Sequence, residues 1–81
     1  MGTKGTLNEA VTEAMNNLEF AADEVRLKLH LASMDARQLW ERTLEPRLLD
    51  ARDTAREATE ASKSKIEETL TAVKKFAEEL R

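Results

Sequence analysis

The feature that most constrains this chain is an apolar pattern that runs unbroken through the first half of the sequence. Apolar side chains recur there at alternating spacings of four and three residues. The series consists of Val11, Met15, Leu18, Ala22, Val25, Leu29, Ala32, Ala36 and Leu39. Such spacings place every member on one side of an α-helix and are typical of helices that pack against other helices. The pattern predicts one long helix.

A second apolar stripe lies on the opposite side of the same predicted helix. At about 100° per residue, its members are Phe20, Leu27, Leu31 and Met34. Soluble monomers seldom expose four large apolar side chains as one continuous patch. We therefore predict that these four residues form a partner or dimer interface.

The second half of the chain has apolar side chains on one side only. Its stripe comprises Leu44, Leu48, Ala51, Ala55, Ala58, Ser62, Ile66, Thr69, Val73, Phe76 and Leu80. The remaining positions are mostly polar or charged. A second long helix with a single packed face is the expected result.

Between the two halves, Thr43 can cap a new helix and Pro46 can occupy its first turn, where a missing amide costs little. We therefore predict an all-α fold: a long antiparallel hairpin with one helix over about residues 7–42 and the other over about 44–80. Two such hairpins would pair through their first helices as a homodimeric four-helix bundle.

The hairpin implies a definite register, in which Ala22 lies near Ile66 and Met15 lies near Val73. The alternative is one long helix kinked at Pro46 in a coiled-coil oligomer, because the apolar stripe continues across the junction.

The N-terminal residues carry a helix start signal. Thr6 and Glu9 have the spacing of a capping box, which predicts that the first helix begins at residue 7. Residues 1–5 are then a disordered tail, and residues 6–81 form a single helical domain. The tail also satisfies the loose N-myristoylation pattern, with Gly2 as the acceptor.

Trp40 is the sole tryptophan, and the hairpin places it beside the turn with Leu44. One interpretation is that the indole fills the closed end of the hairpin. The other is that Trp40 and Leu44 form a turn-end anchor for a partner, because tryptophan is enriched in binding hot spots.

Composition limits the partners. Thirteen Lys and Arg stand against sixteen Asp and Glu, so the net charge of −3 offers no basic excess for a nucleic acid. There is no cysteine, no apolar signal-peptide segment and no stretch long enough to span a membrane. We expect a cytoplasmic protein.

No set of residues has the pattern of a catalytic, cofactor or metal site. His30 is the only histidine, and the residue three before it is Leu27 instead of the glutamate that a di-iron bundle requires. The serines lack a nearby histidine to act as base. We therefore expect no enzymatic activity, no cofactor and no metal.

These features predict a scaffold or adaptor protein that self-associates, or binds another helical protein, through the exposed stripe on the first helix. The alternative function is peripheral binding to lipid surfaces, as apolipoprotein-like or granule-coat-like amphipathic helices do. Basic residues that flank an apolar face favour that function, and here they are matched by acids.

Overall fold

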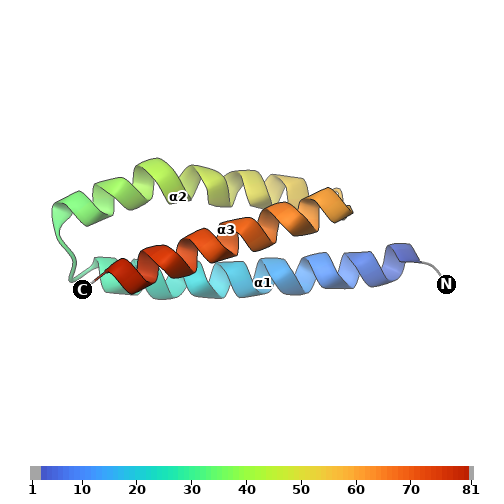
Figure 1. The fold of residues 1–81 in the computed structure, drawn as a ribbon, viewed down its shortest axis with the longest axis horizontal. Coiled ribbons are helices and arrows are strands. Elements are labelled where there is room, and N and C mark those ends of the chain that lie inside the picture. Colours follow the sequence, from blue (N-terminus) through green and yellow to red (C-terminus); the bar gives the residue numbers. More distant parts are fainter. Residues whose placement is uncertain (1–2, 81) are drawn as a thin grey trace.

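The computed structural model describes residues 3–80 and the side chains of residues 7–80. Within that part, the chain forms three α-helices: α1 (Thr3–Leu29), α2 (Met34–Ala55) and α3 (Glu60–Glu79). α1 and α3 run in the same direction, and α2 runs in the opposite direction (Figure 1). The prediction of an all-α fold is confirmed.

The start of α1 lies close to the edge of the described chain. The helix is already formed at Thr3, four residues before the predicted start. The Thr6 side chain of the predicted capping box, and Gly2 with its predicted lipid, fall outside the described residues and side chains. Of the predicted tail over residues 1–5, only residues 3–5 are described, and they belong to α1.

The prediction of two long helices is wrong, because the described residues form three. Residues 30–33 interrupt the helix predicted over residues 7–42, and residues 56–59 interrupt the helix predicted over 44–80. The turn predicted between Thr43 and Pro46 does not form, since α2 continues through both residues. Neither a two-helix hairpin nor a single helix kinked at Pro46 describes this chain.

The first turn is held by polar groups at both helix ends. The Ser33 hydroxyl accepts a hydrogen bond from the Ala36 amide (3.2 Å) and so caps the start of α2. The Arg37 guanidinium donates to the carbonyls of Leu29 (2.8 Å) and His30 (2.9 Å) at the end of α1. These bonds satisfy backbone groups that a helix end leaves unpaired, so the chain can turn without a glycine.

The second turn uses the same kind of cap. The Thr59 hydroxyl accepts a hydrogen bond from the Ser62 amide (3.1 Å) at the start of α3. The buried Ser62 hydroxyl donates to the Thr54 carbonyl near the end of α2 (2.7 Å). Ser62 therefore joins two helices as well as fitting into the small space between them.

The backbone of Ala58 in this turn adopts a left-handed conformation, with φ of 50°. A side chain with a Cβ atom makes that conformation unfavourable, whereas glycine adopts it freely. We expect Ala58→Gly to relieve about 1 kcal/mol of backbone strain in the folded protein. Because glycine also gives the unfolded chain more entropy, the net rise in the free energy of unfolding is expected to be smaller than that. Urea denaturation followed by circular dichroism measures the change.

The matched control for that change is Ala61→Gly. Ala61 is exposed and lies within α3, where glycine is a poorer helix former than alanine. This control is expected to leave the stability unchanged or lower it slightly. A lower stability for Ala58→Gly would contradict the strain assigned to Ala58.

Pro46 lies in the interior of α2, where its missing amide leaves the Arg42 carbonyl without its helical partner. Both residues are exposed, so water can reach that carbonyl. Burial of the opposite side of α2, through Leu44 and Leu48, offsets the local cost of the proline. Tertiary packing thus overrides the signal from which the turn was predicted.

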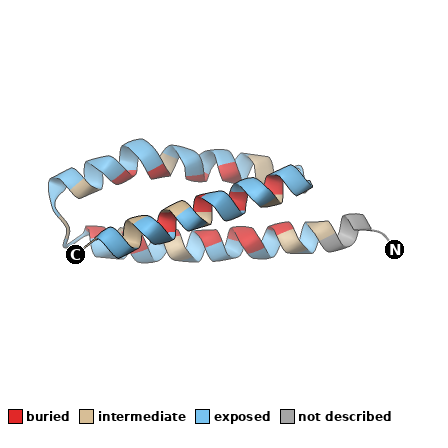
Figure 2. Ribbon diagram, viewed as in Figure 1, coloured by how far each residue is buried: buried red, intermediate tan, exposed pale blue. Residues whose placement is uncertain are grey.

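The buried residues of α1, α2 and α3 lie on the sides that face one another (Figure 2), and their side chains form one apolar core. Its largest fully buried members are Trp40, Leu18, Ile66, Val25, Val73 and Ser62. The α1 part of the predicted apolar series, from Val11 to Leu29, is buried as predicted. The core thus contains the α1 part of that series, while α2 and α3 each contribute one buried side.

The register predicted from the hairpin is wrong. Val73 lies opposite Val25 instead of Met15, since Val25 and Val73 line the same groove between α1 and α3. The reason is direction: α3 runs parallel to α1, whereas a hairpin requires antiparallel helices (Figure 1). Leu39, the last member of the predicted series, is 53% exposed. The first turn interrupts the helix, so the positions that face the core shift along α2 and Trp40 faces the core instead.

Candidate helix-docking surface

Two large apolar side chains of α1 point away from the rest of the bundle. Phe20 and Leu27 are 67% and 70% exposed, whereas Leu18 and Val25, two residues before each, are buried. Residues two apart lie on nearly opposite sides of a helix, and residues seven apart lie one above the other. Phe20 and Leu27 therefore share the side of α1 opposite the core.

The other two predicted interface residues lie beyond the end of α1. The Leu31 amide bonds to the Lys28 carbonyl (3.1 Å), so Leu31 continues the helical path, and its side chain is 94% exposed. Met34 is 69% exposed but is the first residue of α2. The predicted stripe is thus divided by a turn, and we call Phe20, Leu27 and Leu31 the outer α1 surface.

Charged residues flank this surface on both sides. Glu24 and Lys28 lie on the side next to α3, where they line the groove between the two helices. Asp23 lies on the side next to α2 and bonds to Arg26 (3.0 Å), which also bonds to Glu45 of α2. The apolar centre with charged margins resembles the division found in protein interfaces, which have an apolar core and a polar rim.

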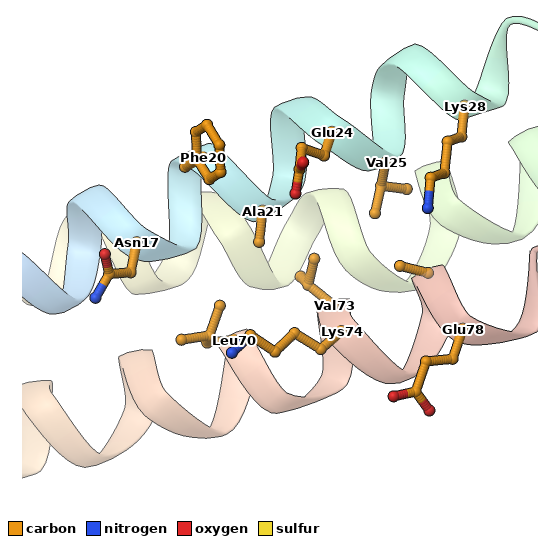
Figure 3. A pocket seen from close by; sticks show the side chains of 11 residues that line it. Asn17, Phe20, Ala21, Glu24, Val25, Lys28, Leu70, Val73, Lys74 and Glu78 are labelled. Atoms are coloured by element: carbon orange, nitrogen blue, oxygen red, sulfur yellow. The ribbon is translucent and has the colours of Figure 1, made fainter.

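A groove of about 470 Å³ adjoins this surface between α1 and α3 (Figure 3). Its apolar lining consists of Ala21, Val25, Leu70, Val73 and Ala77, and Phe20 lies at its edge. Lys28, Lys74, Glu24 and Glu78 contribute both signs of charge to the lining. The small side chains on either side leave space for an apolar side chain of a partner.

Trp40 and Leu44, the predicted turn-end anchor, pack inside the bundle. Trp40 is 1% exposed, and its ring contacts Phe76 of α3 at a centroid distance of 5.3 Å and an interplanar angle of 58°. Leu44, one turn further along α2, is also buried. The structure therefore places both residues in the core, where three helices meet.

A polar cluster beside Trp40 ties α1 to α2. The Arg26 guanidinium donates two hydrogen bonds to the Glu45 carboxylate, each 3.0 Å long. The Trp40 indole N–H donates to the same carboxylate (2.6 Å). Hydrogen bonding from Arg26 lowers the pKa of Glu45 below its usual value, and the same bonds raise the pKa of Arg26. Sequence reasoning missed this cluster because Arg26 and Glu45 are distant in the sequence.

Sequence reasoning also missed an exposed apolar line on α2. Leu39 and Leu49 are 53% and 61% exposed, and the exposed Pro46 lies between them. Leu39, Pro46 and Leu49 are spaced seven and three residues apart, which places them on one side of a helix. This spacing is the sequence signal from which the line could have been predicted. The two leucines of this line are less exposed than the three residues of the outer α1 surface, and the line lies on a different helix.

The outer α1 surface supports binding by apolar contact. Among the described residues, no three histidine, cysteine or acidic side chains gather in a way that could hold a metal ion. None of the helices in the described part is long and apolar enough to cross a membrane.

The sequence matches no family model, and comparisons with curated proteins and with solved structures find no significant match.

Proposed function

We propose that this protein is a non-enzymatic helical interaction protein that self-associates through the outer α1 surface. The observation that carries the proposal is the exposure of Phe20, Leu27 and Leu31, each at least two-thirds accessible to water. None of the three belongs to the core that α1, α2 and α3 share. Stability of the single bundle therefore gives no reason for three large apolar side chains at this place.

The size of the surface supports a reversible complex. The three exposed side chains present an apolar area on the order of 500 Å². A stable interface of standard size buries about 800 Å² on each partner. Contact through this surface and its charged margins is therefore expected to give a dimer in the micromolar range. Because the described part of each protomer has three helices, the dimer would contain six of them instead of the four predicted from two hairpins.

Sedimentation equilibrium of the wild type and of the double variant Leu27→Glu/Leu31→Glu tests this proposal. We expect the wild type to dimerise and the double variant to weaken dimerisation at least a hundredfold, because the added carboxylates would be buried without partners. Its helicity is expected to stay unchanged, since both residues are exposed.

The matched control is Leu39→Glu/Leu49→Glu, which makes the same chemical change on the exposed line of α2. This control is expected to dimerise like the wild type. A wild type that stays monomeric up to about 100 µM would show that the proposed self-association is wrong. Unchanged dimerisation of the Leu27→Glu/Leu31→Glu variant would also show that the proposal is wrong.

Lipid-surface binding has less support from the same side of the molecule. Interfacial helices carry basic residues beside their apolar face. Here Asp23 and Glu24 border the outer α1 surface, Lys28 is the basic residue on the α3 side, and Arg26 on the α2 side is paired with Asp23 and Glu45. Cosedimentation with anionic vesicles measures this alternative directly, and we expect little binding.

A further inference from the structure

The outer α1 surface runs from the C-terminal half of α1 into the turn that follows it. Further towards the N-terminus, the same side of α1 carries Glu9 and Glu13, which are exposed. Phe20 and Leu31 therefore mark the two ends of the apolar part. The midpoint between these ends falls between residues 25 and 26.

The charged residues beside this surface are centred at nearly the same point along α1 as the apolar residues. Glu24 and Lys28 lie on one margin, next to α3, and their midpoint is residue 26. One acid and one base thus lie on either side of the centre of the apolar surface, Glu24 at 1.5 residues from it and Lys28 at 2.5 residues. Such an arrangement is complementary to a copy of itself turned end to end.

From this symmetry we propose that the outer α1 surface binds the same surface of a second copy, with the two α1 helices antiparallel around a two-fold axis near residues 25 and 26. The inference rests on the proposed self-association and specifies its partner, direction and register. Phe20 of each copy packs against Leu31 of the other, and the two Leu27 side chains lie beside the axis.

The charges fix the direction of packing. In the antiparallel pair, the margins next to α3 face each other, so Glu24 of each copy lies beside Lys28 of the other. A parallel pair would place the α3 margin of one copy against the α2 margin of the other. Glu24 would then lie beside Asp23 of the second copy, and the like charges would repel.

Cysteine cross-linking tests the direction, since the chain has no cysteine of its own. In the proposed pair, two Phe20 positions are separated by about 16 Å along the helix axis, at 1.5 Å per residue. A disulfide requires Cα atoms within about 7 Å. Mixed Phe20→Cys and Leu31→Cys proteins are therefore expected to form a disulfide dimer at least tenfold faster than either variant alone.

Charge reversal tests the register. We expect Glu24→Lys and Lys28→Glu each to weaken dimerisation about tenfold, because each places two pairs of like charges at the interface. An equimolar mixture of the two variants restores opposite charges at every pair, so its affinity is expected to return to within about threefold of the wild type. Glu57→Lys, in the exposed turn beyond α2, changes the net charge in the same direction and by the same amount as Glu24→Lys, and it is expected to have less than a twofold effect.

The outcomes separate this inference from the proposed function. Rapid cross-linking of Phe20→Cys with itself would show parallel packing and overturn the inference, while self-association would stand. Unchanged affinity in both charge variants would overturn the register. A monomeric wild type would instead show that the proposed function is wrong.

Discussion

Trp40→Ala is expected to lower the free energy of unfolding by about 4 kcal/mol, a large part of the total for a chain of this length. Trp40 is the largest fully buried side chain, and its ring contacts Phe76. Removal of the indole leaves a cavity between the helices and deprives the Glu45 carboxylate of one donor. Urea titration monitored by circular dichroism at 222 nm measures the loss without relying on tryptophan fluorescence.

Two variants separate ring burial from the hydrogen bond. Trp40→Phe keeps an apolar ring and loses only the indole N–H and some volume, so we expect it to cost about half as much as the alanine variant. Phe20→Ala removes an aromatic ring that is 67% exposed and is expected to change the stability of the monomer by less than about 0.5 kcal/mol. A loss of similar size for Phe20→Ala and Trp40→Ala would contradict the assignment of Trp40 to the core.

Glu45→Gln is expected to lower the free energy of unfolding at pH 7 by about 1.5 kcal/mol. The change removes the charge that accepts two hydrogen bonds from Arg26 and one from Trp40. The side chains of Arg26 and Glu45 are 40% and 32% exposed, so water screens the pair and keeps the expected loss moderate. The control Glu41→Gln changes an exposed residue one helical turn before Glu45 and is expected to change stability by less than about 0.5 kcal/mol.

The effect of Glu45 is expected to depend on pH. Its pKa is lower in the folded protein than in the unfolded chain, chiefly because Arg26 donates hydrogen bonds to the charged form. The stabilisation is therefore complete above the ordinary carboxyl pKa of 4.5 and disappears as the pH falls through the lower folded-state pKa. The stability difference between wild type and Glu45→Gln should shrink as the pH is lowered from 7 towards 3. A constant difference over that range would contradict the lowered pKa.

The α1 part of the fold could be predicted from the sequence because its signal is local and repeated. Val11, Leu18 and Val25 are buried as their spacing predicted, and Phe20 and Leu27 are exposed on the opposite side. Periodicity identifies which side of a helix is apolar, whatever the partner that covers it. The same pattern therefore predicted the outer α1 surface without a correct topology.

The two turns could not be predicted because their signals are weak and the signal at Pro46 is stronger. Ser33 and Thr59 cap new helices, yet neither has a glutamate or glutamine three residues later to form a capping box. Ala58 takes a left-handed conformation that usually indicates a glycine. Pro46, in contrast, has the local character of a helix start but remains inside α2.

The sequence by itself determined that the chain is helical, which residues of α1 are buried and that large apolar side chains are left on its outer side. Only the tertiary structure decided the number of helices, the parallel direction of α1 and α3, and the burial of Trp40 beside Glu45 and Arg26. The physical reason is that helix periodicity depends on neighbours three and four residues apart. The turns depend on whether three short helices bury their apolar sides together better than two long ones, which is a property of the whole chain.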